Sequence, residues 1–516
     1  MNHPACQARS IRRGIAMLAV LIVVTMISLA GLSFVALLSA ENKAIRTHGA
    51  ELQMHNILAS GMELLKVNLA PGLPRDPGGW YDNPELFRDV LVVDDPATKL
   101  RGWFSIVSPR REDGEARGIR FGLENESARL HLGMVWQWEQ RQPGAGRQAL
   151  LKLPGMTPIA ADSILDWIDP DSQPRESGAE ADYYAGRGAP YAPRNGLPAA
   201  IEELLLVRGV TRDLMFGTDT NFNHLLDAGE GTNFADRLDT LQAGGLSDWY
   251  SLLTVYSAER NLTPEGNRRI NLNDANLALL SRQLTQRFDR RTADFVIAYR
   301  QFGPYQGPPL PLTATQAAIN PSAPARFKFA TVLDVMGAQV QITGPLGQTV
   351  AILTSPLTLD RPSMDEYLPR LLDYTTVDAV PVIPGRVNVN LAPQVVLECV
   401  PGMDDLLVSQ ILASRPAGED GTPPERRYPT WLYLEGLVDL ARMKALMPYI
   451  TTGGDVYRAQ IVGYYERPSP GGRAEVVVDA TGPQPRQLYW KDLAIFGRGY
   501  PPDVLGPPTA GDTPTQ

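Results

Sequence analysis

The stretch that decides the fold is residues 15–40, IAMLAVLIVVTMISLAGLSFVALLSA, which contains no charged side chain. As an α-helix it extends about 39 Å, enough to cross a hydrocarbon core of roughly 30 Å. Arg9, Arg12 and Arg13 precede it, and the first acidic residue of the chain is Glu41. Because arginine is enriched on the cytoplasmic side, we predict one transmembrane helix whose N-terminal end faces the cytoplasm.

A secretory signal peptide and a plain signal anchor are alternative interpretations of this segment. A signal peptide fits less well, because its apolar region is only about 7–15 residues long and ends at a small-residue cleavage site. Arg12-Arg13-Gly14-Ile15 favours another interpretation, since a basic leader ends in glycine and the apolar helix follows at once. This arrangement resembles type IV pilin-like proteins, which prepilin peptidase cleaves after the glycine. The resemblance implies cleavage after Gly14 and a mature, methylated N-terminus at Ile15.

The fifth residue of the predicted mature chain is Ala19. Pilin-like proteins usually carry glutamate there, although a carboxylate inside a bilayer is costly unless it is paired. In that family its partner is taken to be the free amine of a neighbouring subunit. A subunit with alanine is therefore not expected to be a repeating shaft subunit. Among pseudopilins the lack of this glutamate is characteristic of the K-type minor subunit, which is thought to lie at the tip.

Composition narrows the class of protein. The chain has 516 residues, a net charge of −9, 44% hydrophobic and 20% charged residues, which is the composition of a folded protein. The acidic balance argues against a general nucleic-acid binder. Cys6 and Cys399 are the two cysteines, which excludes a disulfide framework.

The rest of the chain predicts an α+β fold. The N-terminal helix should continue to residue 66, because 41–66 lack proline and Leu58, Met62 and Leu65 form an apolar stripe. Strands are expected at 101–108, 118–132, 457–465, 473–480 and 487–491. We therefore predict a pilin-like fold, in which a long N-terminal transmembrane helix packs on an antiparallel β-sheet and a large α-helical domain is inserted into that sheet.

The predicted segments follow one another along the chain. They are a cleaved leader 1–14; the helix 15–66, transmembrane at 15–40; a β region 67–145; an inserted helical domain 146–285; a second helical and hairpin region 286–450 with a Pro-rich linker 304–327; C-terminal strands 451–499; and a disordered tail 500–516.

Helix-hairpin-helix-like units recur in the insertion. Leu153-Pro154-Gly155-Met156 and Val400-Pro401-Gly402-Met403 each separate two helical segments, and residues 269–275 resemble 386–392. Such units often bind the DNA backbone through hairpin amides. Acidic residues surround these hairpins and would repel phosphate, which favours a structural or protein-contact role: Asp162, Asp166, Asp169, Asp404 and Asp405.

Several blocks, in one order, resemble the type II secretion minor pseudopilin K family, also called general secretion pathway protein K. They are the leader and helix at 12–66, FGLENESARLHLG at 121–133, LPGM…ADSILDWIDPD at 153–171, GAEADYY at 178–184, YAPRNGLPAAIEELLLVRGVT at 191–211, RRINLNDAN at 268–276 and GRVNVNLAP at 385–393. The family is usually shorter, so the region 286–450 is an elaboration that the resemblance does not explain.

The resemblance implies a function, partners and a location. The protein would be a non-enzymatic minor pseudopilin at the tip of a short pseudopilus, helping to initiate or cap its assembly and to export folded proteins across the outer membrane. Its partners would be minor pseudopilins I and J, the major pseudopilin, prepilin peptidase, the inner-membrane assembly platform and secreted substrate proteins, and not nucleic acid. It would span the inner membrane once, with most of the chain in the periplasm. The alternative is a minor pilin of a type IV pilus or a DNA-uptake apparatus.

One loop has the pattern of a calcium site. Residues 219–230, DTNFNHLLDAGE, place oxygen-bearing groups at positions 1, 3, 5, 7, 9 and 12 of an EF-hand-type loop: Asp219, Asn221, Asn223, Leu225 through its carbonyl, Asp227 and Glu230. His224 stands at position 6, where glycine is usual because φ is often positive. The alternative is a polar surface loop rich in Asx turns.

A second acidic cluster follows the DWID block. The cluster comprises Asp166, Asp169, Asp171, Glu176, Glu180 and Asp182. Asp169, Asp171 and Glu180 are its candidate ligands of another calcium ion, and the alternative is a solvated loop with helix-capping acids. The resemblance supports the metal, because K-type proteins bind calcium in their helical domain. Calcium is thus the predicted cofactor.

Overall fold

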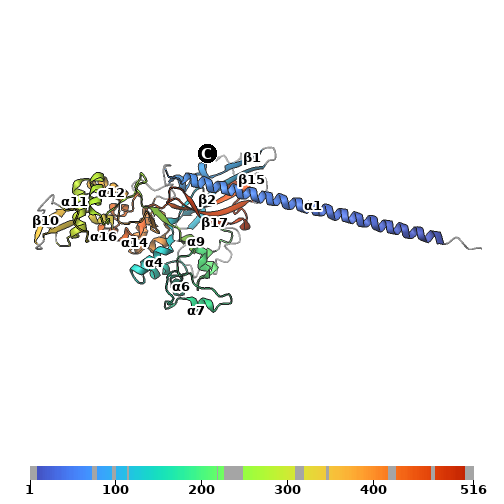
Figure 1. Cartoon of the computed structure of the whole chain (residues 1–516), viewed down its shortest axis with the longest axis horizontal. Coiled ribbons are helices and arrows are strands. Elements are labelled where there is room, and N and C mark those ends of the chain that lie inside the picture. The colour runs from blue at the N-terminus through green and yellow to red at the C-terminus, as the bar shows by residue number, and fades with distance from the viewer. Residues whose placement is uncertain are drawn as a thin grey trace, which may run out of the picture.

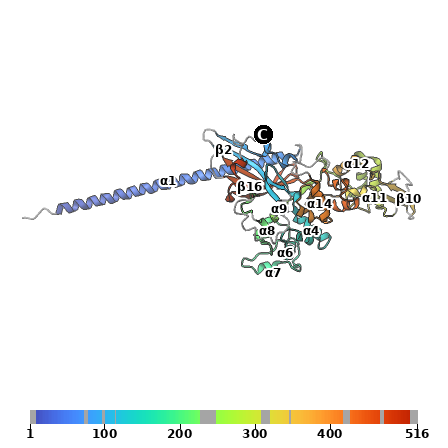
Figure 2. The ribbon, with the colours of Figure 1, turned by 180° about the vertical axis from the view of Figure 1, so that it is seen from behind.

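The computed structural model describes residues 8–71, 78–95, 100–112, 115–217, 219–225, 248–307, 319–344, 348–415, 426–465 and 471–505. Its longest element is helix α1 (Ala8–Asn68), which projects far beyond the rest of the chain (Figure 1). The predicted cleavage point between Gly14 and Ile15 lies inside this helix. Seen from behind, α1 projects from one end of the molecule, and α11, α12 and β10 lie at the opposite end (Figure 2).

The two halves of α1 have different surroundings. From Ala16 onwards α1 is long and apolar enough to cross a membrane, judged by length and composition, and no other helix among the described residues is. The side chains of its apolar N-terminal stretch, such as Leu21 and Leu29, are exposed. Near its C-terminal end, Leu58, Met62 and Leu65 are buried against the sheet, which confirms the predicted stripe. A Cβ at Gly61 would lie 2.6 Å from Ile461 Cγ2, so the helix approaches the sheet closely there.

The sheet joins the two ends of the chain. Its order is β1-β2-β15-β16-β17, with β3 paired to β2 and β4 to β15, and all of these pairs are antiparallel. Ile106 of β2 stands opposite Ile461 of β15, so strands far apart in sequence are neighbours. The strands are β1 (Val90–Asp95), β2 (Leu100–Glu112), β3 (Glu115–Arg120), β4 (Glu124–Asn125), β15 (Val456–Tyr465), β16 (Gly472–Asp479) and β17 (Arg486–Asp492). The antiparallel sheet and the long apolar helix agree with the predicted mixed fold.

One predicted strand is interrupted. Residues 118–132 were expected to be continuous, but β3 ends at Arg120 and a short 3-10 helix, η1 (Glu126–Ala128), follows β4. The Asn125 side chain accepts a hydrogen bond from Ser127 N and so caps η1. Local side-chain capping therefore competes with the strand here.

The middle of the chain consists of three units, each closed by a two-residue parallel strand pair. In unit 1 (residues 130–254), β5 (Leu130–His131) pairs with β6 (Leu253–Thr254). In unit 2 (270–376), β8 (Ile270–Asn271) pairs with β11 (Thr375–Thr376). In unit 3 (387–451), β13 (Val387–Asn388) pairs with β14 (Ile450–Thr451).

Each unit carries its helices between its two strands. Unit 1 holds α4 (Leu132–Arg141), α5 (Ala145–Leu151), α6 (Pro158–Ile168), α7 (Ala181–Ala185), η2 (Ile201–Leu206), α8 (Arg212–Phe216) and α9 (Trp249–Leu252). Unit 2 holds α10 (Leu277–Arg287), α11 (Arg290–Phe302), η3 (Val332–Val335), the hairpin β9 (Gln339–Thr343) with β10 (Thr349–Thr354), and α12 (Arg361–Tyr374). Unit 3 holds α13 (Gln394–Glu398), α14 (Asp405–Ser414), α15 (Trp431–Leu434) and α16 (Leu440–Leu446). Units 1 and 2 are followed by β7 (Ala258–Arg260) and β12 (Val382–Pro384), which pair with each other.

The same turn bonds recur in all three units. After each first strand a side chain accepts a hydrogen bond from the amide two residues on, and after each second strand a threonine hydroxyl does the same. The pairs are Gly133 N to His131 Nδ1 (3.0 Å), Asn273 N to Asn271 Oδ1 (2.9 Å) and Asn390 N to Asn388 Oδ1 (2.9 Å), then Tyr256 N to Thr254 Oγ1 (3.0 Å), Asp378 N to Thr376 Oγ1 (3.1 Å) and Gly453 N to Thr451 Oγ1 (3.1 Å). The units are thus internal repeats, of which the sequence had revealed two similarities: that of 153–156 to 400–403 and that of 269–275 to 386–392.

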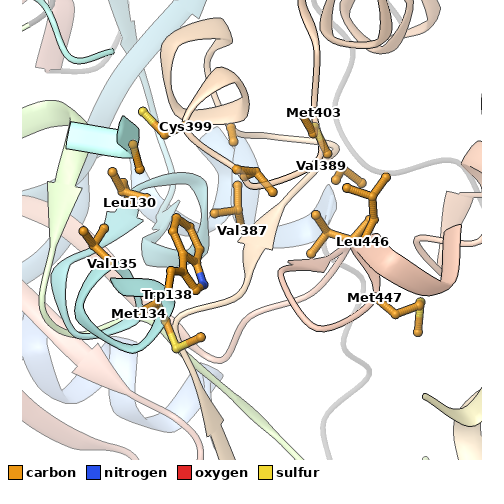
Figure 3. Close-up of a cluster of buried hydrophobic side chains, with 14 of the residues drawn as sticks. Leu130, Met134, Val135, Trp138, Val387, Val389, Cys399, Met403, Leu446 and Met447 are labelled. Carbon is orange, nitrogen blue, oxygen red and sulfur yellow. The ribbon is translucent and has the colours of Figure 1, made fainter. Parts of the chain in front are cut away.

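The units share one hydrophobic core, while the sheet and α1 form another. Figure 3 shows Leu130 and Trp138 of unit 1 next to Val387 of unit 3. Cys399 is buried there, and burial raises the pKa of its thiol to about 12, as expected for a core residue.

Some predicted boundaries differ from these units. A boundary between residues 285 and 286 falls inside α10, and one between 145 and 146 falls at the start of α5. The disordered tail predicted from residue 500 is wrong for residues 500–505, because Tyr500 and Leu505 are buried and α17 (Pro502–Leu505) ends at Leu505. The Leu505 carbonyl accepts a hydrogen bond from Tyr464 OH at 2.8 Å, which holds this segment on the sheet. Residues 506–516, and residues 308–318 of the predicted linker, lie outside the described residues.

Candidate functional site: an acidic turn and a docked loop

The first candidate site is the turn that follows α6. Thr157 caps the start of this helix and Asp169 caps its end, and Glu180 precedes the first residue of α7. The chain therefore turns back between Asp169 and Glu180. As a result, carboxylate oxygens of Asp169, Asp171 and Glu180 lie within 4.8 Å of one another. The structure thus brings together the three residues that the sequence had proposed.

Arg175 organises this turn from within. Its Nη1 donates to Asp166 Oδ1 at 2.6 Å and to Asp169 Oδ2 at 2.5 Å, and its amide also donates to Asp166. A Cβ at Gly178 would lie 1.8 Å from Asp166 Oδ2, so only glycine permits this closure without a shift. Arg175 is half-buried and neutralises one of the four negative charges that Asp166, Asp169, Asp171 and Glu180 contribute.

The remaining charge is poorly satisfied by protein. Asp169 Oδ1 and both carboxylate oxygens of Glu180 are buried and accept no hydrogen bond of good geometry from the described residues. Burial, reinforced by the charge of Asp169, raises the pKa of Glu180 to about 7. Burial also raises the pKa of Asp169, even though Arg175 opposes the shift. Buried carboxylate oxygens without partners are the hard ligands that a divalent cation such as calcium prefers.

The second candidate is the start of the EF-hand-type loop. Asp219 Oδ2 accepts from His224 N at 2.9 Å, Asn221 Oδ1 from Asn223 N at 2.9 Å, and Asn223 Oδ1 from Leu225 N at 2.8 Å. His224 has φ +57°, the conformation expected at position 6. Asp227 and Glu230 lie outside the described residues, so the second half of the proposed ligand set has no structural description.

This loop is docked on the sheet by residues that the sequence did not single out. Gln460 Nε2 donates to the Phe222 carbonyl at 2.7 Å, and Arg473 Nη1 donates to the same oxygen at 3.1 Å. Asn223 Nδ2 donates to the Gly499 carbonyl at 2.8 Å. Arg473 is fully buried in β16. Its positive charge lies beside the loop, as does Lys491, whose Nζ is 4.2 Å from the centre of the Phe222 ring, and both charges disfavour a cation.

A buried ion network joins unit 1 to the sheet and was also missed. Arg458 of β15 donates through Nε to Glu126 Oε1 at 2.5 Å and through Nη1 to Glu475 of β16. Tyr250 OH of α9 donates to Glu475 Oε1 at 3.0 Å. Burial opposes the ionisation of Glu475, but Arg458 and Lys491 hold its pKa below the usual value. Charged residues inside a predicted strand were the available signal, because they must find partners when buried.

These features define a class of protein. Within the described residues there is one candidate membrane-spanning helix, near the N-terminus, and the C-terminal part of this helix packs on an antiparallel sheet that carries inserted helical units. Residues 137–216 match the family model described as type II secretion system (T2SS), protein K. The match runs from α4 to α8 and contains the Asp169, Asp171 and Glu180 turn. Residues 137–216 are therefore a domain of this family, and the resemblance to minor pseudopilin K is confirmed.

The other comparisons concern curated proteins and solved structures. No curated protein matches the sequence. The crystal structure of the GspK-GspI-GspJ complex from the enterotoxigenic Escherichia coli type 2 secretion system matches with a TM-score of 0.33 and 10% identity, covering 87% of this chain and 98% of that chain.

Proposed function

We propose that this protein is a minor pseudopilin at the tip of the type II secretion pseudopilus, where it initiates or caps assembly and so promotes protein export. The observation that carries the proposal is the family match over α4 to α8. It is supported by α1, whose N-terminal part is long and apolar enough to span the inner membrane and leave the globular part in the periplasm. Minor pseudopilins I and J are the proposed partners in the tip complex.

Ala19 supports a tip position over a shaft position. Its side chain is exposed on α1, in the segment that would lie in the bilayer, and it offers no carboxylate to a neighbouring subunit. A subunit that cannot pair with the amine of the next one fits the end of a filament, where one such contact is missing.

N-terminal mass analysis and a deletion strain test this proposal. We expect the mature chain to begin at Ile15, and cleavage elsewhere or none would contradict a pilin-like anchor. Deletion of the gene should leave exoproteins in the periplasm, and re-expression of the full chain should restore export. Lost twitching or DNA uptake with normal secretion would instead support the alternative, a minor pilin of a type IV pilus or DNA-uptake apparatus.

We also propose that calcium binds the acidic turn, with ligands from Asp169, Asp171 and Glu180, and the loop that begins at Asp219. At the turn, the buried oxygens without partners carry the proposal. When bound, calcium would supply the positive charge that offsets these carboxylates and would tie the end of α6 to the start of α7. Three carboxylates supply part of the six to eight oxygens that calcium takes, and water can supply the rest.

A calcium titration of the purified chain, followed by its unfolding temperature, tests both sites. Glu180→Gln should remove most of the calcium-dependent rise if the turn binds the ion, and Asp219→Ala should reduce it if the loop binds one. Glu176→Gln is the matched control, because Glu176 lies in the same turn and is exposed. A rise that is unchanged in Glu180→Gln would exclude the turn, and one unchanged in Asp219→Ala would exclude the loop.

A further inference from the structure

A cavity of about 540 Å³ lies where the three units meet. Its walls come from α4 of unit 1, from η3, α12 and the strand β11 of unit 2, from the residues around β12 and from the end of α16. This volume is within the range of about 300–1,000 Å³ that is usual for ligand sites. Met134 and Met447, both drawn in Figure 3, line it together with Val332, Leu372, Val377 and Ile383.

The internal repeat shows what is unusual about one of its residues. Arg129, Arg269 and Arg386 hold the same position in the three units, directly before the first strand of each parallel pair. Arg129 Nη2 donates to Glu124 Oε2 at 2.7 Å, and Arg386 Nε forms an ion pair with Glu259. Two of the three equivalent arginines thus have a carboxylate partner within the protein.

Arg269 has no such partner among the described residues. Its Nε donates to the backbone carbonyl of Asp373 at 3.2 Å, and its two terminal nitrogens make no hydrogen bond or ion pair there. The nearby acids are engaged elsewhere, since Glu259 is held by Arg386 and the Asp373 carboxylate pairs with Arg427 at 3.5 Å. Burial lowers the pKa of Arg269, as expected for a guanidinium whose charge is incompletely compensated.

The charge of the cavity is positive although the whole chain is acidic. Arg141, Arg269 and Arg386 line it, against Asp378 as the one acidic residue in the lining. The other walls are mostly apolar. Such a site suits a ligand that offers one anionic group between apolar groups, which disfavours a polyanion such as nucleic acid.

We propose that this cavity binds the carboxylate of an extended peptide whose neighbouring side chains are apolar, with the free guanidinium edge of Arg269 as the anchor. The planar fork of an arginine matches a carboxylate with two parallel hydrogen bonds. The apolar walls accept the adjacent side chains, and Arg141 adds positive charge. This binding site goes beyond the proposed function and does not depend on it.

Peptide retention by the full chain in lipid nanodiscs tests the proposal. The probes are three N-acetylated tetrapeptide pools of apolar residues: one with a free C-terminus, one amidated, and one amidated with an internal aspartate or glutamate. Mass spectrometry measures which peptides are retained. We expect carboxylate-bearing peptides to be enriched over the amidated apolar pool, and the comparison of the first and third pools identifies the source of the carboxylate.

Two variants locate the binding. Arg269→Gln should weaken retention by about tenfold or more, because a charge-assisted pair is lost. Arg268→Gln, the adjacent and exposed arginine outside the lining, should bind as the original chain does. Arg141→Gln, on the exposed side of the cavity, should weaken retention several-fold and decides the matter if Arg269→Gln does not fold. Equal retention of all three pools would overturn the proposal. So would peptide retention by folded Arg269→Gln equal to that of the original chain or, if Arg269→Gln does not fold, such retention by Arg141→Gln.

Discussion

Replacing Arg458 by methionine should loosen the attachment of unit 1 to the sheet. The Arg458 side chain is 5% exposed and lies between Glu126, which is in η1 beside unit 1, and Glu475 of β16. Both carboxylates are almost completely buried. Methionine is similar in length but carries no charge, so Arg458→Met leaves two buried carboxylates, and Lys491 is then the cation that most favours the charged form of Glu475.

The expected cost is about 3–5 kcal/mol, the usual effect of removing one member of a buried ion pair. Against a typical stability of about 5–15 kcal/mol, this is a large fraction. The cost should depend on pH. Without Arg458, burial raises the pKa of Glu475 above its value in the unfolded chain, so the variant loses stability as pH rises through that raised value. The variant should therefore be closer to the original chain at pH 5 than at pH 8.

Urea unfolding in detergent, followed by tryptophan fluorescence at pH 5 and pH 8, measures this difference. Arg486→Met is the matched control, because the Arg486 side chain is 73% exposed in its ion pair with Asp479 and should contribute at most about 1 kcal/mol. The triple variant Glu126→Gln, Arg458→Met, Glu475→Gln should recover much of the loss, since it leaves no buried charge. The reasoning is refuted if Arg458→Met costs no more than Arg486→Met, or if its cost grows towards pH 5.

Three further predictions concern unit 1 and its neighbours. Burial lowers the pKa of His131 to about 4, so the stability that the neutral imidazole contributes above pH 6.5 should fall by about 3 kcal/mol as the pH drops towards 4. His131→Asn, which places in unit 1 the asparagine found in units 2 and 3, should abolish this fall when unfolding is measured over that pH range. A fall that persists in the variant would exclude His131 as its source. Gly385→Ala should cost about 2–3 kcal/mol by urea unfolding, because φ is +68° and the new Cβ would lie 2.1 Å from Met134 Cγ; a neutral result would contradict the close contact between units. Gly178→Ala should lower the free energy of unfolding by about 1–3 kcal/mol and reduce the calcium-dependent rise in unfolding temperature, because the new Cβ would displace the Asp166 carboxylate. An unchanged rise would show that calcium binding does not depend on the closure of this turn.

Much of the candidate site could be proposed from sequence, because its residues lie close together in the chain. Asp169, Asp171 and Glu180 fall within one turn, so their acidic pattern was visible before their distances were known. What the sequence could not show was which carboxylate oxygens Arg175 would occupy. Only the folded turn leaves Asp169 Oδ1 and both Glu180 oxygens without hydrogen-bond partners among the described residues, and the proposed calcium site rests on these oxygens.

The sequence by itself determined the long apolar helix, its buried stripe at Leu58, Met62 and Leu65, and most strands of the sheet. These features depend on local periodicity, which a linear pattern records. Tertiary structure alone decided the three units, since their strand pairs are two residues long and join positions as distant as Leu130 and Leu253. Tertiary structure also decided whether the Arg269 guanidinium has a carboxylate partner among the described residues. A guanidinium is paired or unpaired according to which distant carboxylates reach it, and no local pattern contains that information.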